Sequence, residues 1–173
     1  MYLKCLVVIL SSVLALTLGN ARFTNIKCEV LDPQFANLPK CQLKMVQRGV
    51  AALDIYVKLF QLPLNNISVT SALYKKASGF RPFLYNTTLN FCEYMKNKKK
   101  YPFFNIVVDV FNKNSNVNHT CPYNHDIILH NVILKDSMFK HLPLPEGEYM
   151  VHITVYAYND PKVIVKAYVQ QME

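Results

Sequence analysis

The chain has 173 residues, a formal net charge of +8 and only four glycines. Its length excludes an assembly of several ordinary domains, and the abundance of valine, isoleucine, tyrosine and phenylalanine favours strands. The basic residues are scattered except for Lys96, Lys98, Lys99 and Lys100, a run typical of a solvated loop. The charge therefore predicts no nucleic-acid partner.

The first element, residues 1–21, is a predicted signal peptide. Lys4 precedes an apolar stretch over residues 5–18, and the small residues Gly19 and Ala21 follow it. We expect cleavage after Ala21, with cleavage after Gly19 an equal alternative. The apolar stretch is too short to cross a hydrocarbon core of about 30 Å comfortably, so a transmembrane anchor is disfavoured. No later apolar run approaches membrane-spanning length, so we expect a mature chain with no membrane span.

Hydrophobic and polar residues then alternate in several short segments, which is typical of half-buried strands. The predicted strands of this part of the chain are residues 26–30, 41–45, 51–59, 67–73 and 83–87. In the third of these, Asp54 and Lys58 alternate with apolar neighbours, so both charged side chains are predicted to face away from the core.

Four cysteines remain after the predicted cleavage: Cys28, Cys41, Cys92 and Cys121. An even number in an oxidising compartment predicts two disulfide bonds, although four cysteines allow three pairings. Cys28 and Cys41 point inward from candidate neighbouring strands, so we expect them to pair, which leaves Cys92 with Cys121. The chain contains no C-x-x-C motif, which argues against zinc ribbons and thioredoxin-like sites.

Three N-glycosylation sequons fit the same compartment. They begin at Asn66, Asn86 and Asn118. Strand alternation places the first two on the outward-facing set, where a glycan must lie. We therefore predict glycans on all three asparagines.

One segment breaks the alternation and is predicted to be a helix over residues 102–113. Its polar residues Asn105, Asp109 and Asn112 lie on one stripe of a helix but on opposite faces of a strand, and Pro102 suits the first turn. The wide apolar face is either a lid over the core or one wall of a ligand pocket. The residues predicted to line such a pocket are Phe103, Phe104, Val107, Val108 and Phe111. The lysines of the preceding run would then lie at its entrance and attract an anionic headgroup.

The chain is predicted to end in a hairpin. Alternation over residues 148–158 and 162–170 indicates two strands, and the sequence Asn159-Asp160-Pro161 between them indicates the turn.

Residues able to carry catalysis do not form a recognisable pattern. Among the histidines, His125 and His130 would face opposite sides of one strand, and His119 lies inside a sequon, so we expect no metal site. The chain has no Gly-x-Ser-x-Gly elbow and no phosphate-binding glycine loop. A small basic nuclease would need two histidines and a lysine to converge, which no spacing predicts. We therefore expect a protein that is not an enzyme and that needs no cofactor.

Four motifs carry a resemblance to a known family: residues 81–86 (RPFLYN), 91–95 (FCEYM), 118–123 (NHTCPY) and 142–149 (LPLPEGEY). Their order and spacing resemble a large insect family of secreted proteins, a domain of unknown function that includes chemosensory B-type proteins. That family is distantly similar to the ganglioside activator and to lipid-recognition (ML-like) domains. The resemblance implies an immunoglobulin-like β-sandwich or cup that holds a lipid between its sheets. The activator also ties its first strand to its last by a disulfide, whereas here no cysteine follows Cys121.

The predicted protein is a secreted, mainly β domain over residues 22–173, with seven to nine antiparallel strands and one helix. Its predicted partner is a small hydrophobic molecule, such as a lipid, cuticular hydrocarbon or pheromone, which it presents or sequesters, with an extracellular receptor as a further partner. The alternative is an extracellular interaction module with a filled core that binds a receptor or glycan. An apolar cavity of a few hundred Å³ distinguishes the two.

Overall fold

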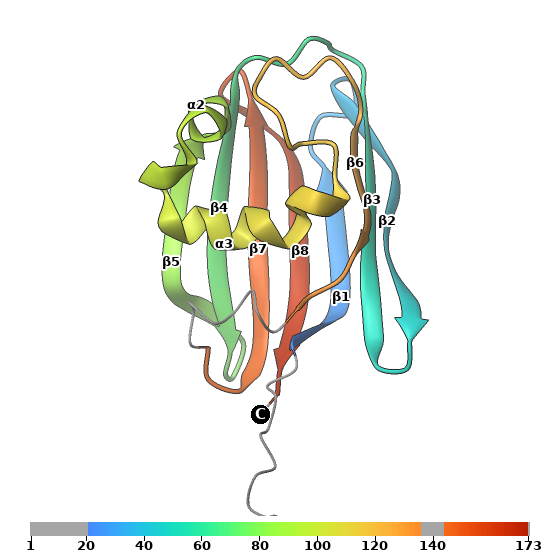
Figure 1. Cartoon of the computed structure of the whole chain (residues 1–173), viewed down its shortest axis with the longest axis vertical. Coiled ribbons are helices and arrows are strands. Elements are labelled where there is room, and N and C mark those ends of the chain that lie inside the picture. Colours follow the sequence, from blue (N-terminus) through green and yellow to red (C-terminus); the bar gives the residue numbers. More distant parts are fainter. Residues whose placement is uncertain (1–20, 136–143, 173) are drawn as a thin grey trace, which may run out of the picture.

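The computed structural model describes residues 21–135 and 144–172 (Figure 1). All of the predicted signal peptide except Ala21 lies outside the described residues. Within them, eight strands form two antiparallel sheets, so the mainly β sandwich predicted from the sequence is confirmed. The strands are β1 (Ala21–Val30), β2 (Ala36–Gln47), β3 (Val50–Leu59), β4 (Ile67–Lys76), β5 (Phe80–Asn90), β6 (Ile127–Val132), β7 (Gly147–Ala157) and β8 (Asp160–Gln171).

The two sheets differ in width. The larger has the strand order β1-β8-β7-β4-β5, and the smaller has the order β2-β3-β6. The predicted hairpin over residues 148–170 is confirmed as β7 and β8. Its turn is centred on Tyr158 and Asn159, slightly earlier than predicted, and both have positive φ angles, 54° and 67°. Positive φ at both central residues is the requirement of a type I′ hairpin turn, whose twist matches the flanking strands.

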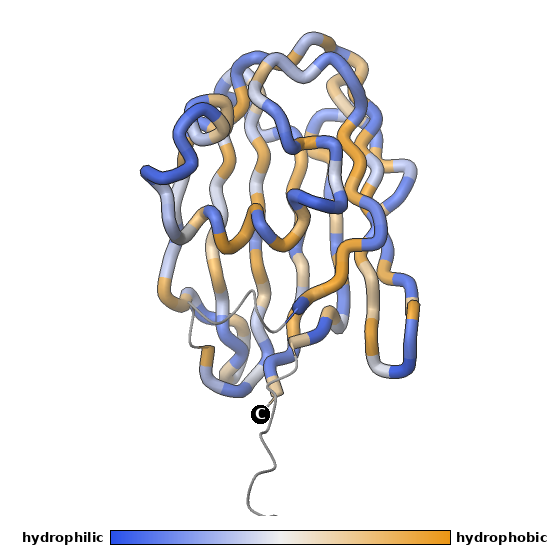
Figure 2. Tube along the Cα trace, viewed as in Figure 1, coloured by the Kyte–Doolittle hydropathy of each residue, from blue (hydrophilic) through white to orange (hydrophobic). Residues whose placement is uncertain are grey.

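The smaller sheet does not cover the whole inner face of the larger sheet, and helices lie over the remainder (Figure 1). The helix α3 (Pro102–Phe111) crosses the inner face of the larger sheet, beside the smaller sheet (Figure 1). The predicted helix over residues 102–113 is therefore present, although its last residues belong to the 3₁₀ turn η2 (Asn112–Asn114). Figure 2 shows hydrophobic residues along much of α3 and a hydrophilic turn before it, which is the 3₁₀ turn η1 (Lys98–Lys100).

A short helix that the sequence analysis did not predict, α2 (Phe91–Lys96), follows β5. The side chain of Asn90 caps it by accepting a hydrogen bond of 3.0 Å from the backbone N–H of Glu93. The buried face of α2 includes Tyr94, whose hydroxyl donates to the Asn105 side chain of α3 over 2.7 Å. One residue of the predicted polar stripe of α3 therefore anchors it to α2 instead of facing solvent.

Both disulfides join the pairs that the sequence analysis predicted. Cys28 is bonded to Cys41 with 6.3 Å between their Cα atoms, and Cys92 is bonded to Cys121 with 5.4 Å. The sequence predicts that Cys28 and Cys41 lie on neighbouring strands, but their strands do not pair with each other. β1 and β2 are edge strands of different sheets, so this disulfide connects the two layers at one side of the sandwich. No helix within residues 21–135 and 144–172 is long and apolar enough to cross a membrane.

Candidate ligand-binding cavity

An apolar cavity of about 270 Å³ lies between the two sheets. It forms where three strands and one helix face five strands. The strands supply the walls of the cavity, because the side chains of each strand that point inward are apolar. Representative wall residues, from β3, β4, β7 and β8 in turn, are Ile55, Val69, Val155 and Val165.

Three of the five pocket residues predicted on the helix line this cavity: Phe104, Val107 and Phe111. Val108 does not line it. That side chain is completely buried and packs in the main hydrophobic core. The side chain of Phe103 lies outside the part of the chain that the structure describes.

Two further residues of α3, Ile106 and Val110, also line the cavity, and sequence reasoning missed them. They are four residues apart and therefore lie on one face of the helix. Because α3 crosses the sheet instead of running along a strand, both flanks of its apolar face reach the cavity. The spacing alone could have identified the pair, but not the direction in which the helix crosses.

Tyr85 lines the cavity and carries a hydroxyl group. Its hydroxyl lies 3.5 Å from the hydroxyl of Ser71, which is completely buried. Burial raises the pKa of Tyr85, so the phenol is neutral at physiological pH and can donate or accept one hydrogen bond.

Lys162 lines the cavity at the end near the β7–β8 turn. Its ammonium group lies 2.8 Å from the Asp32 carboxylate and 5.1 Å from the centre of the Phe35 ring. The hydrogen bond between the two charged groups lowers the pKa of Asp32 and raises that of Lys162. Both groups therefore stay charged and paired at neutral pH, and the lysine stem covers apolar surface.

The predicted position of the lysine run at the entrance is wrong. None of Lys96, Lys98, Lys99 and Lys100 lines the cavity. They lie before α3, where the ammonium group of Lys100 is 5.9 Å from the Tyr101 ring. The run is hydrophilic and mostly exposed, so water surrounds the segment that precedes the helix.

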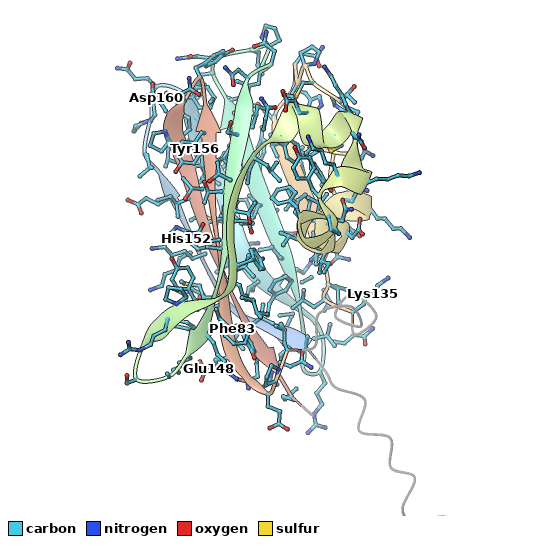
Figure 3. All side chains as sticks on the ribbon, turned by 90° about the vertical axis from the view of Figure 1, so that its left-hand side faces the viewer. Phe83, Lys135, Glu148, His152, Tyr156 and Asp160 are labelled. Atoms are coloured by element: carbon cyan, nitrogen blue, oxygen red, sulfur yellow. A yellow bond between two sulfur atoms is a disulfide. The ribbon has the colours of Figure 1, made fainter. Side chains whose placement is uncertain are left out.

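Other basic residues lie beside the cavity instead. A second, more polar hollow of about 330 Å³ includes Arg22, Arg48 and Lys135, and it shares Leu134 with the apolar cavity. Figure 3 shows Lys135 in the lower half of the molecule and Asp160, next to the β7–β8 turn, at the upper end. The basic hollow and the Lys162 ion pair therefore adjoin different ends of the cavity.

The described histidines do not converge on the cavity. His130 is exposed and lies 3.0 Å from the Asp54 carboxylate. His152 lies on the face of β7 opposite α3 (Figure 3), where burial lowers its pKa. His119 and His125 contact each other in the loop before β6, and His141 lies outside the described residues.

All three sequon asparagines, Asn66, Asn86 and Asn118, are exposed. Their accessibility is compatible with glycosylation, which stays a prediction. Loss of mass after glycosidase treatment of protein expressed in a secretory host would check it.

Comparison with known protein families gives a match over part of the chain. Residues 69–151 match the family described as "Protein of unknown function (DUF1091)". The match runs from β4 to β7, and it includes α3 and the Cys92–Cys121 disulfide. It supports the expectation of a domain-of-unknown-function family. No curated protein matches the chain.

Proposed function

We propose that this protein is a secreted binding protein that holds a small hydrophobic ligand between its two sheets. The apolar cavity of about 270 Å³ is the observation that carries this proposal. Protein interiors are close-packed and contain few voids larger than a water molecule. A cavity near the lower limit of ligand pockets, about 300 Å³, is therefore far larger than a packing defect. Apolar cavities of this kind stay dry and bind apolar molecules.

The chemistry around the cavity favours an amphiphile as the ligand. A hydrocarbon chain suits the apolar walls, and Arg22, Arg48 and Lys135 provide positive charge in the adjoining hollow. A fatty acid combines both features. The resemblance of the chain to secreted insect proteins extends the candidates to cuticular hydrocarbons and pheromones, which the protein would present to an extracellular receptor or sequester.

The alternative function, an interaction module that binds a receptor or glycan through its surface, requires a filled core. The cavity is the feature that favours the binding protein over this alternative.

The proposal is tested by uptake of a fluorescent fatty acid and by its displacement with an unlabelled saturated fatty acid. The decisive variant is Val165→Phe, because Val165 lines the cavity. Its matched control is Ile164→Phe, since neighbouring residues of β8 face opposite sides of the sheet. We expect Val165→Phe to reduce uptake at least tenfold while the protein stays folded, and Ile164→Phe to bind as the wild type does.

Two results would contradict the proposal. The first is a wild-type protein that takes up neither the fatty acid nor a neutral long-chain hydrocarbon. The second is equal loss of uptake in both variants, which would place the binding on the outer surface. Native mass spectrometry of protein from a secretory host gives an independent readout, because a retained lipid adds its own mass.

A further inference from the structure

His119 and His125 lie on a loop that is fixed at several points. The Cys92–Cys121 disulfide connects this loop to α2. Tyr123 and Leu64 exchange two backbone hydrogen bonds, of 2.8 and 2.7 Å. The completely buried ring of Tyr123 supports both imidazoles, with ring centres 4.5 Å from His119 and 5.8 Å from His125. The two histidines are therefore held on a constrained backbone.

Both imidazoles have hydrogen-bond partners at Nδ1. His119 Nδ1 is 2.7 Å from the carbonyl oxygen of Thr120, and His125 Nδ1 is 2.7 Å from that of Asp126. A carbonyl oxygen only accepts, so His119 Nδ1 carries a hydrogen. His125 Nδ1 lies between an acceptor, the Asp126 carbonyl, and a donor, the Asn116 amide, and binds a metal through Nε2 in the tautomer that donates to Asp126. The side-chain amide of Asn116 donates to the same Asp126 carbonyl over 2.7 Å, and its nitrogen lies 3.0 Å from His125 Nδ1.

When both Nδ1 atoms donate to carbonyls, each imidazole presents a lone pair at Nε2. The two Nε2 atoms are 2.9 Å apart. Two lone pairs at this distance repel each other unless a cation lies against both. The structure therefore brings together two imidazole nitrogens that are close enough to share one proton or one metal ion.

We propose that His119 and His125 bind a late first-row divalent metal ion, with Cu²⁺ as the preferred ion. With metal–nitrogen distances of about 2.0 to 2.1 Å, nitrogens 2.9 Å apart subtend an angle of about 90° at the metal. That angle suits neighbouring positions of a square-planar Cu²⁺ site better than the tetrahedral geometry of Zn²⁺. Donation of Nδ1–H to a backbone carbonyl is also the usual outer support of a metal-binding histidine, and both residues have it.

The site has two protein ligands, and water completes it. Within the described residues, no cluster of three or more His, Cys, Asp or Glu side chains could hold a metal. The carboxylate of Asp126 is engaged elsewhere, since it accepts from the Tyr56 hydroxyl and the Leu59 backbone N–H. The sequence predicts no metal site because His125 and His130 would face opposite sides of one strand and His119 lies inside a sequon, whereas in the structure His119 and His125 meet across a loop.

The experiment uses the secreted protein without a polyhistidine tag, titrated with CuCl₂ near pH 7.4 in a non-coordinating buffer. We expect one equivalent to bind, an electron paramagnetic resonance spectrum with coupling to two imidazole nitrogens, and a higher thermal midpoint. His119→Ala and His125→Ala should each lower the affinity for Cu²⁺ at least tenfold. His130→Ala is the matched control, because that side chain is 76% exposed and lies outside the pair, and it should leave the affinity unchanged.

Equal affinity of the wild type and the His119→Ala, His125→Ala double variant would overturn the proposal, since the pair would then share a proton and bind no metal. A wild-type spectrum with coupling to one nitrogen or none would overturn it independently of how the variants fold. Binding of Zn²⁺ but not Cu²⁺ would contradict the choice of ion.

Discussion

Val107 and Val108 are adjacent on α3 and have the same side chain, but Val107 lines the cavity and Val108 is completely buried in the core. Val108→Ala should lower the free energy of unfolding by about 2 to 3 kcal/mol, because two methyl groups leave a packed site. Val107→Ala should cost less than about 1 kcal/mol, because the space beside it is already open. Uptake of the fluorescent fatty acid should change only in Val107→Ala. Urea denaturation and the uptake assay measure the two effects.

These two variants are each other's control, since the chemical change is identical. Equal destabilisation by both would mean that the space beside Val107 is filled, which contradicts its place in the cavity wall.

Asp126 predicts a dependence of stability on pH. The Leu59 backbone N–H, at 2.9 Å, and the Tyr56 hydroxyl, at 2.7 Å, both donate to its carboxylate and lower its pKa. A pKa below that of the unfolded chain, about 3.9, stabilises the fold above that pH, and the contribution is lost as pH falls through the lower folded-state pKa. The free-energy difference between wild type and Asp126→Asn should therefore be constant near neutral pH and shrink below about pH 4.

Denaturation across this pH range measures the effect, and Asp109→Asn is the control because Asp109 is exposed. A difference between wild type and Asp126→Asn that stays constant down to pH 2 would contradict the assignment.

At the scale of one residue, strand alternation does not predict that the Asp54 side chain is buried. The pattern predicts correctly that it alternates with the cavity-facing residues of β3, yet it is only 4% exposed. The Asn131 backbone N–H donates to its carboxylate over 2.7 Å, and His130 lies 3.0 Å away. Both partners come from β6, more than seventy residues later, so the local sequence gives no signal of them.

At the scale of elements, the two disulfides differ in the length of chain that they close. Cys28 and Cys41 are 13 residues apart, and Cys92 and Cys121 are 29 apart. If restriction of the unfolded chain dominates, removing the first should cost about 3 kcal/mol and removing the second about 3.6 kcal/mol. Paired Cys→Ser variants, compared by urea denaturation under non-reducing conditions, measure both costs.

Peptide mapping without reduction provides the control for this prediction, because a Cys28–Cys92 or Cys28–Cys121 linkage would refute the pairing itself. A larger cost for the shorter loop would show that contacts in the native state outweigh the chain-entropy effect.

The elements predicted best from the sequence are those in which hydrophobic and polar residues recur at a regular spacing over many positions. The β7–β8 hairpin alternates over most of its length, and α3 shows polar residues at spacings of four and three. The helix α2 has only six residues, and β6 is equally short and contains Asn131 with a positive φ of 55°. A period cannot be recognised over so few residues.

At the scale of the whole molecule, sequence reasoning predicted a sandwich but not which strand belongs to which sheet. Alternation identifies the inner face of each strand and says nothing about its neighbours. The cavity depends on that missing information, because it arises from the unequal widths of the sheets and the direction of α3. The meeting of His119 with His125 depends likewise on a loop fixed by Cys92, which is remote in the sequence.

Both disulfides lie toward the same end of the sandwich. Cys28 is near the end of β1 that pairs with the start of β8, and Cys92 follows β5 at the end where β4 begins. Figure 1 shows α2, which carries Cys92, at this upper end. Within the described residues, the opposite end of the sandwich, where the β2–β3 turn lies, contains no disulfide (Figure 1). Leu134 lines both the apolar cavity and the basic hollow, so a ligand of the proposed kind that spans this boundary would place its hydrocarbon chain inside and its charged head beside Arg22.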